Sequence, residues 1–298
     1  MEKVCINRCP VCNHEQFQDD IRCIDHYASG ESFQIMRCNN CGFRFTQNFP
    51  DEKEIGPYYE TAEYVSHSDT HKGLTNKLYH VVRHFMLNRK ADMTERISGK
   101  TRGTILDIGC GTGYYLHVMH QRGWHCLGVE KSELASNSAR NHFGLEILSS
   151  LDKTDTNQHF DVITLWHVLE HLQNLSDVFA RLRGLLSEEG TLIVAVPNCD
   201  SYDAHYYKEY WGAYDVPRHL WHFTPHTLGL LARREGFKIE QFAPMPFDAF
   251  YVSILSERYQ HKRLAFLKGM WRGAVALMHS LKNPQKSSSI IYILKRIK

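Results

Sequence analysis

Glycines at positions 109, 111 and 113 follow a short apolar run, and this segment carries the clearest chemical signal in the 298-residue sequence. The run at 105–108 suits a buried strand. Glycine permits a tight turn whose backbone can approach a ligand closely. Residues 114–121 then read as a helix whose N-terminus faces that ligand. The segment therefore predicts a strand, a turn and a helix around a small-molecule site.

An acidic residue follows the next expected strand. That strand covers roughly residues 124–129, and Glu130 comes 21 residues after Gly109. A carboxylate in this place can accept hydrogen bonds from both hydroxyls of a ribose in doubly wound folds. The dinucleotide fingerprint G-x-G-x-x-G would need glycine at Tyr114, whereas here Gly113 comes one residue early. These residues indicate a nucleotide-type cofactor and leave open a dehydrogenase or a turn without a ligand.

The series Asp107-x-Gly109-x-Gly111-x-Gly113 resembles motif I of the class I S-adenosylmethionine (SAM)-dependent methyltransferases. The resemblance implies that Glu130 binds the SAM ribose and that the glycine turn passes beneath the methionine part of the cofactor. The cofactor-binding residues that it implies are Asp107, Gly109, Cys110, Gly111, Gly113, Glu130, Trp166 and His167.

Polar residues also follow the expected fourth strand, where Trp166 and His167 are succeeded by Glu170 and His171. Ligands in doubly wound sheets sit beyond the carboxyl ends of the strands. The segment resembles motif IV of the same superfamily, close to the ubiquinone O-methyltransferase type, in which a Glu-His pair lies near the substrate. His171 is therefore a candidate catalytic base. The alternative is that Glu170 and His171 hold the neighbouring loops by hydrogen bonds.

Four cysteines form two C-x-x-C pairs with 25 residues between the pairs. Two such turns can place four thiolates around one tetrahedral Zn²⁺, which would be structural because four protein ligands leave no open position. Gly42 suits the second turn, and residues 32–37 suit one strand of a hairpin. The sequence thus predicts a zinc-ribbon module over residues 1–48, with free thiols as the alternative. The predicted metal ligands are Cys9, Cys12, Cys38 and Cys41.

A second cluster of Arg, His and Trp occupies residues 215–225, before an expected helix. It resembles a segment that recurs in methyltransferases with this ribbon and in relatives near cell-surface sugar pathways. Arg218 can pair with an anionic group through two hydrogen bonds, and a histidine can accept a proton near neutral pH. We expect Arg218 and His222 in the substrate site and His219 as a second candidate base. The alternative buries Trp221 in the core and bonds both histidines to the backbone.

From residue 100 onward, strand and helix patterns alternate, which predicts a sheet with helices on both faces. We expect an α/β fold with a doubly wound, seven-stranded, mostly parallel Rossmann-like sheet, preceded by the small zinc ribbon. Residues 100–298 would form the SAM-binding methyltransferase domain. The expected strands are 104–108, 125–129, 146–148, 160–165, 191–196, 237–242 and 289–294.

Residues 49–99 read as a connecting segment followed by an N-terminal helix. Methyltransferases of this kind carry such a helix ahead of the first strand, often over the SAM pocket. Its apolar face would hold Leu74, Leu78, Val81, Val82 and Phe85. The aromatic residues of the connecting segment either line the SAM pocket or pack against the protein, and the sequence leaves both roles open. These residues are Tyr58, Tyr59 and Tyr64.

The C-terminal region is strongly basic. Residues 258–298 hold ten Lys or Arg and no Asp or Glu, so the preceding chain, with 25 basic and 33 acidic residues, has a net charge of −8. Residues 264–278 read as a basic, apolar helix within an insertion near 257–285. Such a helix can lie on an anionic membrane, line a lipid-like substrate's pocket, contact nucleic acid, or pack against the protein. Contact with lipid would require Trp271 to be partly exposed.

The composition, 43% apolar with a net charge of +2 and no leader-like or spanning apolar stretch, leads us to expect a cytoplasmic enzyme. The function that we expect is SAM-dependent methyl transfer to a small or lipid-linked metabolite, at oxygen. One alternative is an RNA methyltransferase that grips RNA with its ribbon. Residues 2–51 hold five Lys or Arg against seven acids, which is a poor surface for phosphate. Another alternative is a non-catalytic SAM-binding scaffold.

Overall fold

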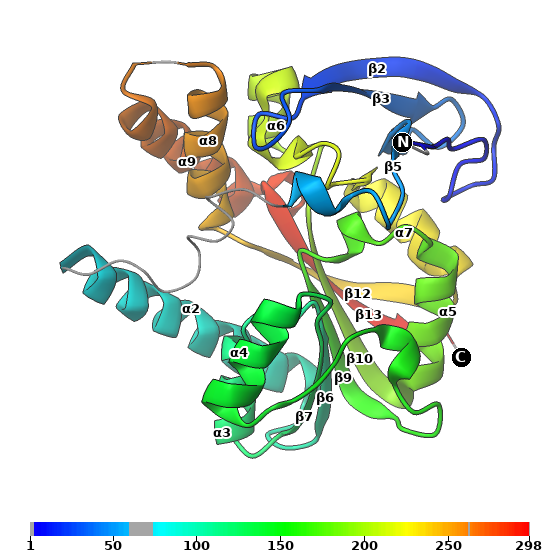
Figure 1. The fold of residues 1–298 in the computed structure, drawn as a ribbon, viewed down its shortest axis with the longest axis vertical. Coiled ribbons are helices and arrows are strands. Elements are labelled where there is room, and N and C mark those ends of the chain that lie inside the picture. The colour runs from blue at the N-terminus through cyan, green and yellow to red at the C-terminus, as the bar shows by residue number, and fades with distance from the viewer. Residues whose placement is uncertain (1–2, 60–73, 262, 298) are drawn as a thin grey trace.

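The computed structural model describes residues 3–59, 74–261 and 263–297. Within these residues a seven-stranded sheet with helices on both faces forms the main body (Figure 1). The strands lie side by side in the order β12-β13-β10-β9-β6-β7-β8. Their bounds are β6 Thr104–Ile108, β7 His125–Val129, β8 Glu146–Leu148, β9 Phe160–Trp166, β10 Leu186–Pro197, β12 Phe237–Pro244 and β13 Ser289–Arg296. The expected doubly wound α/β sheet is confirmed.

The order of the strands reverses between β6 and β9, which lie side by side and run parallel. From β6 the chain continues to β7 and β8 on one side, and from β9 it continues to β10 on the other. Ligands bind outside the carboxyl ends of the strands at such a switch point. Strand β13 runs antiparallel to both of its neighbours, so the sheet is mostly parallel, as expected.

Helices α3 (Tyr114–Gln121) and α4 (Glu133–Phe143) lie on one side of the sheet, and α5 (Leu175–Leu185) and α7 (Pro225–Arg234) lie on the other (Figure 1). Helix α3 starts directly after the glycine turn, as its pattern predicts. Helix α7 begins after Thr224, whose hydroxyl accepts a hydrogen bond of 3.1 Å from the Thr227 amide. A hydroxyl cap of this kind fixes the point at which the preceding segment becomes helical.

The N-terminal residues form a second sheet of four described strands, in the order β11-β4-β3-β2. The hairpin of β2 and β3 agrees with the strand expected at residues 32–37. Strand β11 comes from the segment before α7, so the large domain supplies an edge strand to the ribbon sheet. The bounds are β2 Phe17–Ile24, β3 Ser32–Cys38, β4 Arg44–Thr46 and β11 Trp221–His222, while β1 Lys3–Val4 pairs with β5 Phe49–Pro50.

The ribbon and the large sheet share one hydrophobic core. Phe43 and Phe45 of the ribbon are fully buried in the same cluster as Trp221 and Phe223. The ring centroids of Phe43 and Trp221 are 6.1 Å apart. The ribbon is therefore packed as part of the larger body.

Helix α2 (Leu74–Ser98) precedes β6, as expected. Its C-terminal half is packed, since Ala91 is fully buried and Thr94 shares a hydrogen bond of 2.8 Å with Tyr115. Its N-terminal half extends away from the sheet (Figure 1). Phe85 is 53% exposed, so it is not buried on an apolar face as expected. The side chains of Leu74, Leu78, Val81 and Val82, and the whole of Tyr64, lie outside the described residues.

Two helices, α8 (Asp248–Tyr259) and α9 (Ala265–Lys282), form the insertion between β12 and β13. The insertion thus begins earlier than the expected position near 257, while the helix expected at 264–278 corresponds to α9. A further short helix, α6 (Tyr202–Tyr207), lies beside this pair (Figure 1). Among the described residues, no helix combines the length and the apolar character needed to span a bilayer.

Candidate active site and cysteine cluster

The turn after β6 holds three glycines in the left-handed region, with φ of +69° at Gly109, +55° at Gly111 and +80° at Gly113. A Cβ on Gly109 would collide with Val168, and a Cβ on Gly113 would lie 2.8 Å from the Cβ of Ala139. Nothing lies within 4 Å of the place where a Cβ of Gly111 would stand. The turn is therefore tightly packed at both ends and leaves an open backbone surface in its middle, where a ligand can approach.

Glu130 stands at the end of β7, beside this open surface. Its Oε2 accepts a hydrogen bond of 2.9 Å from the Gly111 amide, and its Oε1 accepts one of 2.8 Å from the Ser132 amide. The backbone thus fixes the carboxylate while each oxygen keeps capacity for another donor. An open glycine surface beside a fixed carboxylate suits a ligand that carries hydroxyl donors.

Asp107, in β6 beneath the turn, is buried and accepts a hydrogen bond of 2.6 Å from the Thr164 hydroxyl. Burial raises the pKa of Asp107 to about 7. Cys110 packs its thiol against Gly128, where a Cβ would lie 2.7 Å from the sulfur. These two residues shape the turn from below and leave its open side to Gly111.

Trp166 ends β9, and helix α2 approaches the site there. The ammonium of Lys90 lies 4.3 Å from the centroid of the Trp166 ring, close enough for a cation–π contact. Burial lowers the pKa of Lys90. The ring of Trp166 also meets Tyr115 of α3 edge-on at 5.7 Å. Trp166 is thus wedged between α2 and α3 at the carboxyl edge of the sheet.

His167 has a positive φ of +56° and lies between two carboxylates. Its Nδ1 is 3.3 Å from Oε1 of Glu170, and its Nε2 is 2.9 Å from Oδ2 of Asp248. Burial opposes protonation, but Asp248 and Glu170 outweigh it and raise the pKa of His167 to about 10. A protonated His167 therefore ties the loop after β9 to the first turn of α8.

His171 and His219 face each other, with ring centroids 4.6 Å apart. Nδ1 of His171 is 2.9 Å from the carbonyl oxygen of Arg218, and a carbonyl can only accept, so Nδ1 carries the proton. Burial, together with the neighbouring His219, lowers the pKa of His171 to about 4. His171 is therefore neutral near pH 7, and its Nε2 keeps a lone pair. Nδ1 of His219 donates in the same way to the carbonyl of Ala213 at 2.8 Å.

The buried carboxylate of Glu170 completes this group. The ligand atoms of Glu170, His171 and His219 lie within 4.8 Å of one another, so the three can share a proton or a cation. Burial opposes the charge of Glu170, but His167 and His219 lower its pKa. Val168, two residues earlier, packs on Gly109, so the loop that carries Glu170 and His171 lies against the glycine turn at this point.

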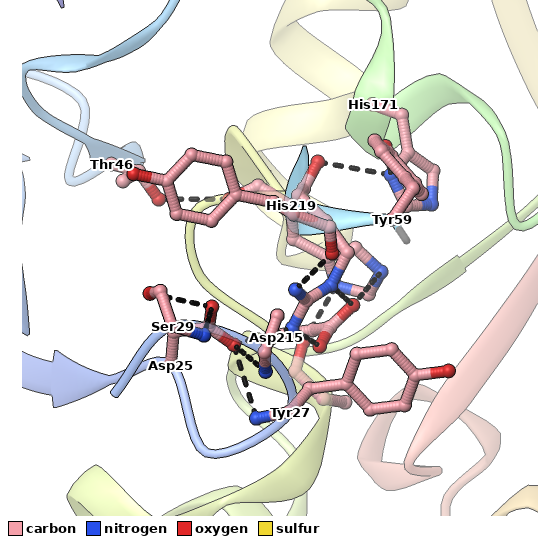
Figure 2. A network of polar contacts seen from close by, with 12 residues as sticks. Asp25, Tyr27, Ser29, Thr46, Tyr59, His171, Asp215 and His219 are labelled. Atoms are coloured by element: carbon pink, nitrogen blue, oxygen red, sulfur yellow. Dashed lines mark hydrogen bonds and ion pairs between the residues drawn. The ribbon is translucent and has the colours of Figure 1, made fainter. Parts of the chain in front are cut away.

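Arg218 belongs to a polar network that links the ribbon to the histidine cluster. Figure 2 shows four of the other members, Asp25, Asp215, His171 and His219. The guanidinium of Arg218 donates to Asp25 at 2.9 Å and to Asp215 at 2.7 Å. A third hydrogen bond of 2.8 Å goes to the carbonyl of Tyr58. Arg218 is 4% exposed, so its donors face the protein interior. The hydroxyl of Tyr59, the next residue, lies 3.1 Å from Nδ1 of His171.

His222, in β11, is buried between the ribbon and the segment before α7. Its Nε2 lies 3.0 Å from the hydroxyl of Thr46, which itself donates to the carbonyl of His219 at 2.8 Å. Burial, together with His219 and Arg44, keeps the pKa of His222 well below its usual value. The structure thus brings His171 and His219 together and places His222 apart from them, in the interface with the ribbon.

The four cysteines expected as metal ligands converge at one end of the ribbon, with all four sulfurs within 4.8 Å of one another. The sulfurs of Cys9 and Cys41 are 3.6 Å apart, as are those of Cys12 and Cys38. Zn–S bonds of about 2.3 Å in a tetrahedron separate sulfurs by about 3.8 Å, so the cluster fits Zn²⁺. Gly42, in the second turn, has a φ of +74°, which suits the glycine at this position.

The comparison with known protein families identifies the large domain. A family model described as a methyltransferase domain matches residues 82–241, more than half of the chain. The chain belongs to the class I SAM-dependent methyltransferases. The segment matched includes the glycine turn, Glu130 and the histidine cluster.

Curated methyltransferases match over a shorter stretch. The ubiquinone biosynthesis O-methyltransferase of Glaesserella parasuis is 30% identical over 123 residues, which are 37% of this chain and 52% of the relative. That of Hahella chejuensis is 35% identical over 85 residues, 26% of this chain and 35% of the relative. The chain thus spans about half or less of the curated relatives that it matches.

Solved methyltransferases share the fold at low identity. Magnesium protoporphyrin IX methyltransferase from Synechocystis PCC 6803, solved with SAH, aligns over 83% of this chain and all of its own, with a TM-score of 0.54 and 14% identity. The 1,6-didemethyltoxoflavin-N1-methyltransferase of Burkholderia thailandensis aligns over 94% of this chain and all of its own, with a TM-score of 0.51 and 14% identity. Both likenesses concern the fold alone.

Three residues of this methyltransferase's site were missing from the sequence-based prediction. Asp248 pairs with His167, Asp25 pairs with Arg218, and Asp215 lies between Arg218 and His219. Asp248 follows β12, whose carboxyl end lies at the ligand edge of the sheet, so that position is a signal that could have revealed it. Nothing local in the sequence marks Asp25, because its partner comes from a distant segment.

Proposed function

We propose that the chain transfers a methyl group from SAM to an oxygen of a small-molecule or lipid-linked acceptor that binds beside His171. The observation that carries the proposal is the position of the histidine cluster, on a loop that packs directly against the glycine turn. The methyl donor and a base would then share one site.

The cofactor supplies an electrophilic methyl on its sulfonium. In the proposed site Glu130 accepts hydrogen bonds from the ribose, and the open surface at Gly111 receives the methionine part. Asp107 and Cys110 support the turn, while Trp166 and His167 border the cofactor at the end of β9. Alignment of the acceptor oxygen with the transferred methyl would provide most of the acceleration.

His171 is the proposed base. Its Nδ1–H is held by the Arg218 carbonyl, so Nε2 is available to take the proton from an acceptor hydroxyl. A base of this kind contributes about 10²–10⁴-fold to the rate. His219, at ring contact with His171, is the second candidate. Arg218 and His222 support the site indirectly, since both side chains are buried and bonded to other parts of the protein.

We further propose that Zn²⁺ occupies the cysteine cluster with a structural role. Four thiolates would complete a tetrahedral coordination and leave no position for an acceptor. The metal would hold the two turns of the ribbon, and through β4 and β11 it would support the segment that carries His219.

The acceptor class can be identified with labelled SAM. Purified protein is incubated with separated lipid, small-molecule and RNA fractions of the host, and Glu130→Ala serves as a cofactor-defective control. We expect label in the lipid or small-molecule fraction, lost in the control. Label in the RNA fraction would support the RNA alternative instead, and no label in any fraction, with SAM binding intact, would support a scaffold.

A further inference from the structure

Helix α9 packs on α8 through its small residues. Gly269, Gly273, Ala276 and Ser280 are buried. A Cβ on Gly269 would lie 2.5 Å from the Cα of Ile254, and one on Gly273 would lie 2.7 Å from the Cα of Phe250. The two backbones therefore approach closely along this side. Because the small residues take the inner side, the large apolar residues of α9 are left on the outer side.

The outer side of α9 is an exposed apolar face. In a helix with about 3.6 residues per turn, its large residues fall on one continuous arc. Trp271 is 66% exposed, and contact of this helix with lipid requires its partial exposure. We call this surface the α9 face; its exposed residues are Phe266, Leu267, Met270, Trp271, Met278 and Leu281, with Leu264 just before the helix.

A groove with an apolar wall and a cationic border runs beside the α9 face. Its volume is about 450 Å³. Arg272 lies over the ring of Tyr206 at 4.0 Å, with Lys268 one turn earlier along α9. The one acid in its lining, Glu257, is 2% exposed and accepts a hydrogen bond of 3.0 Å from Tyr207. The lining is formed by Tyr206, Glu257, Leu264, Leu267, Lys268, Trp271 and Arg272.

The charge around the α9 face favours an anionic partner. Arg263 and Lys268 are exposed at its N-terminal end, and Lys282 is exposed at its C-terminal end. No acid occurs between residues 258 and 298. A second copy of this chain would bring the same cations together, which disfavours self-association through this face. Aromatic and aliphatic side chains bordered by Lys and Arg are typical of helices that lie in the interface of an anionic bilayer.

We propose that the α9 face is a docking surface for an anionic phospholipid membrane. The apolar side chains insert among the acyl chains, while Lys268 and Arg272 pair with lipid phosphates at the groove. Helix α8 connects the docked α8–α9 pair to the proposed active site, because Asp248 in its first turn accepts a hydrogen bond of 2.9 Å from His167. A docked enzyme would thus hold its site near lipid-linked molecules. This proposal goes beyond the proposed function and can be tested without an acceptor.

The full-length protein is mixed with vesicles of phosphatidylcholine, with or without phosphatidylglycerol, and the bound fraction is measured by co-sedimentation. We expect binding to the anionic vesicles only, weakened by salt because screening acts over about 8–10 Å. The fluorescence of Trp271 should shift to the blue, since three of the other four tryptophans, Trp124, Trp211 and Trp221, are already buried.

Two matched pairs of variants locate the surface. Leu267→Asp should lower vesicle affinity by about tenfold or more, since a charge is costly at an apolar interface. Leu134→Asp, at another exposed leucine, in α4, should leave the affinity unchanged. Lys268→Gln should weaken binding to anionic vesicles, while Lys131→Gln, whose side chain is 75% exposed elsewhere, should not. Melting curves and SAM binding show that each variant remains folded.

Three results would overturn the proposal. The first is absence of binding to anionic vesicles. The second is equal binding to neutral and anionic vesicles without a salt effect. The third is a dimer in sedimentation analysis that Leu267→Asp converts to monomers, which would make the α9 face an interface between two copies. None of these results would bear on methyl transfer, so the proposed function stands or falls separately.

Discussion

At the scale of single residues, the glycine turn and Glu130 form the site that we propose for the cofactor. Gly109 and Gly113 are glycines because neighbouring side chains leave no space for a Cβ, whereas Gly111 has free space beside it. The Gly111 amide fixes the Glu130 carboxylate at 2.9 Å. A side chain at Gly111 would therefore occupy the space that we assign to SAM.

We predict that Glu130→Ala lowers SAM affinity by about tenfold to a hundredfold, because hydrogen bonds to a carboxylate are each worth about 1.5–3 kcal/mol. Gly111→Val should abolish measurable binding, since it fills the open surface and needs a φ of +55°. Calorimetric titration checks both. Glu133→Ala, at an exposed acid in the first turn of α4, is the control. Unchanged affinity in Glu130→Ala and Gly111→Val would remove the site assignment.

The histidine cluster also acts at the residue scale. His171→Ala and His219→Ala should each lower kcat, the former by about 10²–10⁴-fold, while SAM affinity stays within a few-fold. His120→Ala, at an exposed histidine of α3, should keep full activity. A fall in melting temperature that matched the loss of activity would favour a scaffolding role for these histidines.

His171 also makes a pH prediction. Its pKa falls from the ordinary 6.5 to about 4 in the folded protein, so the unfolded chain binds the proton more tightly. The stability linked to His171 is thus present above pH 6.5 and is lost as the pH falls through 4. Urea unfolding measured across this pH range should show a smaller loss of unfolding free energy in His171→Gln than in the wild type. An identical pH dependence in both proteins would contradict a neutral His171.

At the scale of secondary-structure elements, β11 and the segment before it join the ribbon to the histidine cluster. Strand β11 pairs with β4, and the carbonyl of Arg218 holds His171. Arg218 in turn reaches Asp25 in the loop between β2 and β3 (Figure 2). The geometry of the histidine cluster therefore depends on a loop of the ribbon.

We predict that Arg218→Ala lowers the free energy of unfolding by about 3–5 kcal/mol, because it leaves the buried carboxylate of Asp25 without its partner. Arg8→Ala breaks an ion pair whose side chains are 73% and 61% exposed, and it should cost about 0–1 kcal/mol. Denaturant titration compares the two. Equal effects would mean that the Asp25–Arg218 pair does not hold the ribbon loop.

At the scale of the whole molecule, the ribbon and the large sheet form one packed body. They share a core around Phe43 and Trp221 and a sheet through β11. Loss of the proposed zinc should therefore lower the stability of the large domain as well as that of the ribbon. A ribbon that was independent would instead melt separately and leave the SAM site intact.

We predict one equivalent of zinc in the protein purified without chelator. Cys41→Ser should lose the metal and lower the melting temperature of the whole chain in a single transition, because ribbon and sheet share their core. Cys5→Ser, at an exposed cysteine outside the cluster, should retain both metal and stability. Elemental analysis and calorimetry provide the measurements. Absence of zinc would reject the metal site, and two separate transitions would reject the shared core.

The amino-acid sequence by itself determined the elements of the sheet and the cysteine cluster. Strands β6, β7 and β8 have the predicted bounds, because short apolar runs are local signals, and Gly109 and Glu130 mark the ends of the first two. Turns of C-x-x-C type are local as well, and this explains why Cys9, Cys12, Cys38 and Cys41 could be grouped before their positions were known.

Only the tertiary structure decided what the polar side chains contact. Asp25 and Arg218 are 193 positions apart, and no periodicity or spacing in the sequence links residues so distant. The same holds for the burial of Arg218 and His222, which have the polar character of substrate-binding residues but are enclosed by the ribbon. In α9 the sequence showed a basic, apolar helix, but the close contact of Gly269 and Gly273 with α8 decided that its apolar side faces outward. Packing partners determine burial, and they come from parts of the chain that local patterns do not reach.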